Sequence, residues 1–67
     1  MIYYQVVTRF YDGGYVEVSD VKTFEGDRMP ESGSSEAAVC DIYYDYFDNE
    51  KEAEKFRREA LREAGRR

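Results

Sequence analysis

The sequence predicts an α+β fold in which a three-stranded antiparallel sheet is followed by one C-terminal helix, in the order β-β-β-α. Three observations support this prediction. Residues 2–11 and 37–47 are rich in β-branched and aromatic side chains. These side chains fall alternately on two faces, with the period of two that is typical of strands. Glycines follow the first of these segments, where a hairpin turn is expected. Residues 50–64 consist largely of strong helix formers.

Residues 2–24 predict a hairpin of the first two strands. An Asp-Gly-Gly turn precedes residues 15–24, and these residue types favour tight turns because they tolerate positive φ or bond to their own backbone. The alternation of the second strand slips near Asp20, because Val21 and Phe24 fall on opposite faces. A bulge or an early strand end near Asp20 would explain this slip.

Residues 25–36 have the composition of a loop, with the only Pro, two Gly and three Ser. A loop of this length is unusual in so small a chain, and it is either mobile or carries contacts.

Residues 37–47 predict the third strand, which completes a sheet most simply arranged as a meander. The even-numbered set is expected on the core face: Ala38, Cys40, Ile42, Tyr44 and Tyr46. The odd-numbered set contains two acids and is expected to be wetter: Val39, Asp41, Tyr43, Asp45 and Phe47.

A helix is predicted over residues 49–64, with Asp48 or Asn49 as its N-cap. Its apolar residues are spaced for one narrow stripe, which we expect to pack on the even-numbered face of the sheet. The stripe consists of Ala53, Phe56, Ala60, Leu61 and Ala64. Residues 1–67 therefore form a single small domain in this interpretation.

One helix can cover only one face of such a sheet, so the other face is expected to expose aromatic side chains. An uncovered apolar patch usually marks an interface, and tyrosine suits one because it offers a large area with few rotatable bonds. We expect self-association through this face or through a strand edge; the alternative is the ordinary outer face of a monomer. The predicted partner-binding residues are Tyr3, Tyr11, Tyr15, Tyr43, Asp41 and Asp45.

Charge divides the chain in two. Residues 1–48 carry three basic and ten acidic side chains, net −7, whereas residues 49–67 carry seven basic and five acidic ones, net +2. The acidic half could meet a basic groove on a partner protein, or it could simply maintain solubility. The helix arginines could touch phosphates, so nucleic acid is a possible but not a favoured partner. The candidate residues for such a contact are Arg57, Arg58 and Arg62.

The residue inventory argues against several classes of protein. One Cys and no His exclude an internal disulfide and the usual zinc sites. The sequence also lacks a run of about 20 apolar residues, so no membrane span is predicted. Without His there is no ordinary general base near neutral pH, so enzymatic activity is not favoured. We expect no metal site and no cofactor. Because no signal-peptide pattern appears at residue 1, we expect a cytoplasmic protein.

Two segments carry a family resemblance: residues 6–18 (VVTRFYDGGYVEV) and 41–56 (DIYYDYFDNEKEAEKF). Together they resemble a group of very short proteins of prophages and gut-bacterial mobile elements. That group includes an anti-CRISPR protein with a fold similar to transcriptional positive cofactor four. The resemblance implies a small oligomeric sheet-plus-helix protein that acts against CRISPR targeting by nicking supercoiled DNA. It also implies that Asp12, in the Tyr-Asp-Gly turn, is the candidate catalytic residue.

The resemblance implies a small acidic phage-type accessory protein of the bacterial host cytoplasm that antagonises a bacterial defence system, with a CRISPR effector as the expected partner. It would act as a binding module or as a homo-oligomer. Two alternatives remain open. One is metal-dependent nicking of supercoiled DNA, which would require a divalent cation. The other is a structural or regulatory oligomer with no antagonist role.

Overall fold

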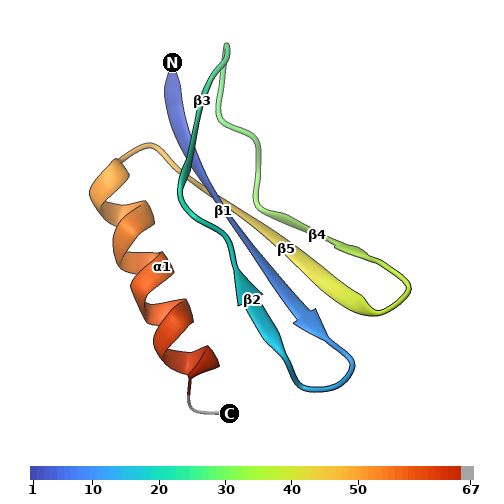
Figure 1. The fold of residues 1–67 in the computed structure, drawn as a ribbon. Helices are drawn as coiled ribbons and strands as arrows, with labels where there is room; N and C mark the ends of the chain where they lie inside the picture. The colour runs from blue at the N-terminus through green and yellow to red at the C-terminus, as the bar shows by residue number, and fades with distance from the viewer. Residues whose placement is uncertain (66–67) are drawn as a thin grey trace.

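The structure, a computed structural model, describes residues 1–65 and has the predicted α+β class. Its elements in chain order are β1 (Ile2–Tyr11), β2 (Val16–Val18), β3 (Lys22–Glu25), β4 (Gly33–Glu36), β5 (Cys40–Phe47) and α1 (Glu50–Ala64) (Figure 1). The sheet therefore has five antiparallel strands, and the expectation of three is wrong. The two additional strands come from a division of the predicted second strand and from the predicted loop.

The strand order places the first and last strands in the centre of the sheet. It runs β2-β1-β5-β4, and β3 pairs with β1 on the edge that β2 also occupies. A meander would have placed the second strand in the centre, so that expectation is also wrong. The long pairing of β1 with β5, from Tyr4 opposite Phe47 to Tyr11 opposite Cys40, forms the middle of the molecule.

The division between β2 and β3 lies where the alternation slips, and Ser19 explains it. The Ser19 N–H donates to the Val7 carbonyl (2.8 Å), as a strand residue would, but the Val7 N–H donates to the Ser19 hydroxyl (2.9 Å) and not to a backbone carbonyl. The Ser19 carbonyl is thereby released, and it accepts a hydrogen bond from Arg57 Nε of the helix (2.9 Å). Arg57 also pairs with the Asp20 carboxylate (3.0 Å) and so joins the helix to the interrupted edge.

The strand β4 occupies the second half of the predicted loop. Its four residues, GSSE, are all exposed, and β4 pairs only with β5. An edge strand that is exposed on both faces has no alternation of apolar and polar residues, so the usual sequence signal of a strand is missing. The turn from β4 to β5 takes up residues 37–39, and the last strand begins at Cys40 and not at residue 37.

The helix packs on the face that carries the even-numbered residues of β1 but the odd-numbered residues of β5. In the β1–β2 pair Thr8 lies opposite Val18, whereas in the β1–β5 pair Thr8 lies opposite Tyr43. We call this side the helix face; its main residues are Tyr4, Val6, Thr8, Phe10, Val16, Val18, Asp41, Tyr43, Asp45 and Phe47. The prediction that Ile42, Tyr44 and Tyr46 face the helix is therefore wrong, because one residue of register exchanges the two faces of a strand.

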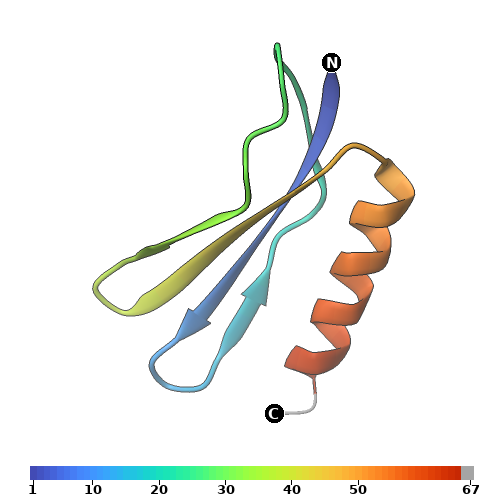
Figure 2. The same ribbon diagram turned by 180° about the vertical axis from the view of Figure 1, so that it is seen from behind.

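The helix itself is confirmed, with Asn49 as its N-cap. The Asn49 side-chain oxygen accepts hydrogen bonds from the N–H groups of Lys51 (2.8 Å) and Glu52 (3.3 Å). Ala53 is fully buried against the sheet, and the ring of Phe56 lies 5.3 Å from that of Phe47. Leu61, which was expected in the buried stripe, is 41% exposed. The helix lies over β1, β2 and β5 and has no contact with β3 or β4 among the described residues (Figures 1 and 2).

The buried core is very small. Five described residues are buried: Val6, Val7, Thr8, Cys40 and Ala53. The molecule is a slab whose extents are 37, 24 and 14 Å. Its accessible surface is 4949 Å², against about 4400 Å² for a typical monomeric protein of 7.9 kDa. The radius of gyration of 12.4 Å also exceeds the value of about 11 Å expected for this length. The fold thus leaves more surface uncovered than a self-contained domain does.

Among residues 1–65, Thr8 is the one buried polar side chain, and its hydroxyl has no hydrogen-bond partner there. A buried hydroxyl without a partner costs about 1–3 kcal/mol. Thr8→Val keeps the shape of the side chain, so it should stabilise the fold by about 1–2 kcal/mol. Urea denaturation would measure the change. Thr23→Val at an exposed position of β3 is the matched control and should stay within about 0.5 kcal/mol of the parent. A loss of stability in Thr8→Val would show that the hydroxyl is satisfied.

Candidate functional site: the open face of the sheet

No helix of the described residues covers the face opposite α1, and we call this the open face (Figures 1 and 2). Its centre is formed by alternate residues of β1 and β5: Tyr3, Gln5, Val7, Arg9 and Tyr11, and Cys40, Ile42, Tyr44 and Tyr46. Residues of the edges complete it: Tyr15, Glu17, Lys22 and Phe24 on one side, and Ser35 on the other. Five of the seven tyrosines therefore share this face.

The aromatic rings of the open face form two clusters. At one end the Tyr3 ring stacks on Phe24, with centroids 5.7 Å apart, and meets Tyr46 edge-on at 6.0 Å. At the other end Tyr11 and Tyr15 lie 5.5 Å apart beside the hairpin turn, where Gly14 has the positive φ (89°) that the sequence predicts. Pairs of this geometry hold each other in place, so the face presents a largely preformed aromatic surface.

The polar groups of this face are mostly satisfied within it. The Gln5 amide donates to the Tyr46 hydroxyl (3.2 Å), and the hydroxyls of Tyr44 and Ser35 are 3.5 Å apart. Arg9 pairs with Glu17 at 3.3 Å. Burial of an interface over such a surface leaves few hydrogen bonds to replace.

Tyr11 remains a protonated donor at neutral pH. Desolvation by its surroundings raises the pKa of Tyr11 above its ordinary value of 10.0, and the nearby Glu17 carboxylate raises the pKa further. The Tyr11 hydroxyl donates to that carboxylate at 3.5 Å. The charged groups of the face are Arg9, Glu17 and Lys22, so it is close to neutral although the chain as a whole carries −5.

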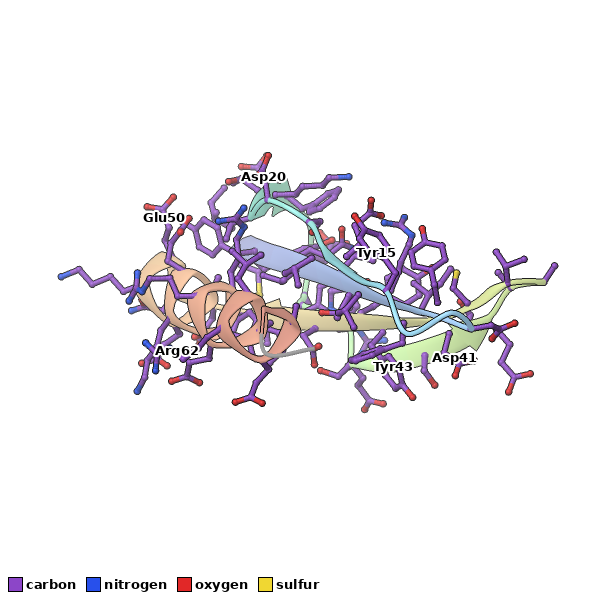
Figure 3. The ribbon with its side chains drawn as sticks, turned by 60° about the horizontal axis from the view of Figure 1, so that its bottom comes forward. Tyr15, Asp20, Asp41, Tyr43, Glu50 and Arg62 are labelled. Atoms are coloured by element: carbon purple, nitrogen blue, oxygen red, sulfur yellow. The ribbon has the colours of Figure 1, made fainter. Side chains whose placement is uncertain are left out.

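The structure separates the predicted partner-binding residues. Tyr3, Tyr11 and Tyr15 lie on the open face, as predicted. The placement of Tyr43, Asp41 and Asp45 on that face is wrong, since all three lie on the helix face. Figure 3 shows Tyr43 and Asp41 on the side of the sheet opposite to Tyr15. The tyrosines that the prediction missed are Tyr44 and Tyr46.

Asp45 lies on the helix face beside β4, and burial raises the pKa of this carboxyl above 3.8, although a hydrogen bond with Ser32 opposes the effect. A raised pKa means that the folded state binds the proton more tightly than the unfolded state does. The charged form of Asp45 thus reduces stability at neutral pH, and this loss disappears as the pH falls through the raised pKa.

Asp45→Asn should therefore be more stable than the parent at pH 7, and the difference should shrink as the pH approaches 3.8. Urea denaturation across this range measures the difference at each pH. Asp27→Asn makes the same change of charge at an exposed loop position. A difference that grows as the pH falls would contradict the assignment.

The remaining candidates lie apart from the open face. Asp12 is exposed at the tip of the β1–β2 hairpin, where its N–H donates to the Val39 carbonyl (3.0 Å). Arg57 is engaged with Ser19 and Asp20, whereas Arg58 and Arg62 are exposed on the helix. Residues 1–65 contain no group of three or more acidic, Cys or His side chains placed to hold a metal ion. They contain no helix long and apolar enough to cross a membrane.

Comparison with known proteins adds no neighbour to this description. No protein-family model, no curated protein and no solved structure matches the chain. The resemblance to prophage proteins therefore stays a prediction.

Proposed function

We propose that this protein is a binding module that associates with a second copy of itself through the open face of its sheet. The observation that carries the proposal is the concentration of five tyrosines on a nearly neutral face that no helix covers. Tyrosine is enriched in protein interfaces, and an aromatic patch of this extent on a soluble domain usually marks one.

The area of the open face matches the requirement of a stable dimer. A sheet four strands wide spans roughly 19 Å at about 4.8 Å per strand, and the paired part of β1 and β5 runs for roughly 27 Å at about 3.4 Å per residue. Its side chains thus cover roughly 500 Å² in projection. A standard interface removes about 800 Å² of accessible surface from each partner. The open face can supply this value, because its protruding side chains have a larger accessible surface than their projected area.

Charge favours a second copy as the occupant. Two chains of −5 repel each other, so their contact is least costly where acidic side chains are few. The open face has that property, because Asp41 and Asp45 lie on the other side of the sheet. A two-fold axis would place the same aromatic surface of each copy against the other, as in most symmetric dimers.

Sedimentation equilibrium of the complete chain tests self-association. We expect a mass that rises with concentration to that of a dimer. A monomer at all concentrations up to the millimolar range would remove the proposal. Because an interface between copies is a hydrophobic contact, the association should persist at high salt, which weakens purely electrostatic contacts.

The resemblance to prophage proteins supplies a biological role for this module, namely antagonism of a bacterial defence system with a CRISPR effector as the target. Phage plating on cells with an active defence system tests this role separately from self-association. Rescue of the phage by the expressed protein is expected. If phage is not rescued in any of several defence systems, the antagonist role is wrong, and the sedimentation result decides on the dimer alone.

Relaxation of supercoiled plasmid with Mg²⁺, and its loss in Asp12→Ala, would favour the nicking alternative.

A further inference from the structure

The helix face contains a groove between the C-terminal half of α1 and the strands β1 and β5, with a volume of about 620 Å³. This volume falls within the range of about 300–1000 Å³ that is typical of ligand sites. The helix lies over β1, β2 and β5 but approaches β5 less closely than β1 and β2, and the groove lies between these strands and the helix (Figure 1). It lies on the opposite side of the sheet from the open face, so it is independent of the proposed dimer.

The lining of the groove combines an apolar floor with an acidic rim. Phe10, Val16, Tyr43 and Phe56 belong to the apolar part, and the rings of Phe10 and Tyr43 meet edge-on at 5.4 Å. Phe10 and Tyr43 stay 38% and 43% exposed, although they lie next to the core. Among residues 1–65, the charged residues of the lining are all acidic: Asp41, Asp45, Glu59 and Glu63. Asp41 and Asp45 of β5 and Glu59 of α1 place carboxylates on both sides of the groove, where they attract a cation and repel phosphate.

Thr8 provides an observation that does not depend on the acidic rim. It lines the groove, is 5% exposed, and its hydroxyl has no hydrogen-bond partner. Buried polar atoms are almost always paired, so a hydroxyl without a partner in residues 1–65 marks a position where a polar atom of a bound molecule could be accommodated. Desolvation of the nearby Asp45 carboxyl, which raises its pKa, agrees with a site that a cation would complete.

We propose that this groove binds a basic peptide segment of a partner protein, in which an arginine or lysine stands beside an apolar side chain. The apolar side chain would lie against Phe10, Tyr43 and Phe56, and the cation would pair with Asp41 and Asp45. The Thr8 hydroxyl oxygen exposes less than 1 Å², so a polar atom of the segment would satisfy it once the side chains that cover it move aside. Charge complementarity selects such a partner over nucleic acid.

Fluorescence anisotropy with a short labelled peptide of alternating leucine and arginine tests the proposal. Asp41→Asn with Asp45→Asn should weaken binding about tenfold, or about 1.4 kcal/mol, because two ion pairs with the peptide are lost. The matched control is Asp27→Asn with Glu31→Gln, which makes the same change of net charge at exposed loop positions and should alter affinity by less than about twofold. Substitution of every arginine of the peptide by glutamate should abolish binding.

Thr8→Val provides a readout that a loss of folding cannot mimic, since it should weaken peptide binding while making the protein more stable. Equal weakening by the groove pair and by the loop pair would overturn the proposal, because it would show attraction to net charge alone. The proposal would also be wrong if the groove pair changed the sedimentation mass and left the peptide affinity unaltered, since the groove would then contact a second copy. Failure of the dimer proposal changes neither result.

Discussion

Replacement of Tyr44 with glutamate is expected to convert the protein to a monomer. Tyr44 lies opposite Val7 near the middle of the open face, so the proposed dimer would bury two glutamates close to its axis. An uncompensated buried charge costs about 3–5 kcal/mol, which raises the dissociation constant by more than about two orders of magnitude. Sedimentation velocity at a concentration where the parent is dimeric would show the smaller mass.

Tyr43→Glu is the matched control for this experiment. The two positions are adjacent in β5 and receive the same substitution, but Tyr43 lies on the helix face. Tyr43→Glu should therefore remain dimeric. Loss of the dimer in Tyr43→Glu alone would place the interface on the helix face and contradict the proposal. Loss in both variants would point to general destabilisation, and circular dichroism of each variant would show whether the fold persists.

Val6→Ala is expected to have the largest effect on stability. Val6 is fully buried between the sheet and α1, where Ala53 is also fully buried. Its truncation leaves a cavity in a core of very few residues and should cost about 2 kcal/mol. A chain of this length has about 3–10 kcal/mol of stability in total. The melting temperature should therefore fall by about 8–16 °C in a calorimetric scan.

Val39→Ala is the control for Val6→Ala, because the same two methyl groups are removed from a side chain that is 58% exposed in the β4–β5 turn. It should change stability by less than about 0.5 kcal/mol. Both proteins must be compared at one concentration, since self-association stabilises the folded state by mass action. Similar melting temperatures for the two variants would contradict the placement of the core.

Local features of the fold were predictable from the sequence because local chemistry determines them. The Gly14 turn, the interruption near Asp20 and the Asn49 cap each depend on a few neighbouring residues. The helix is likewise confirmed, since its residues are strong helix formers and its apolar stripe is regular. These features need no knowledge of which strands pair.

The positions of the third predicted strand and of the loop depended on long-range pairing and were less predictable. Even-numbered residues of β1 pair with odd-numbered residues of β5, so the two faces of β5 are exchanged relative to the prediction. Both faces of β5 contain aromatic residues that could fill a core. Tyr43 and Tyr44 therefore gave no local signal of their orientation. The strand β4 lacked a signal altogether, because none of its side chains is buried.

The exchange of faces changes the interpretation of charge more than that of the fold. The predicted interaction surface mixed tyrosines with Asp41 and Asp45, which suggested one acidic site. In the structure these groups separate into a neutral aromatic face and an acidic groove on opposite sides of the sheet. Two surfaces of different chemistry thus favour two different partners, a second copy and a basic peptide.

Contacts between copies can be observed directly in a mixture of isotopically labelled and unlabelled protein. An isotope-filtered nuclear Overhauser experiment on this mixture detects only protons that are close across the interface. The proposed dimer predicts signals between copies from the rings of Tyr44 and Tyr46 and from the methyl groups of Ile42 on the open face. Signals confined to Tyr43 and Leu61 on the helix side, or no signal between copies at millimolar concentration, would contradict it.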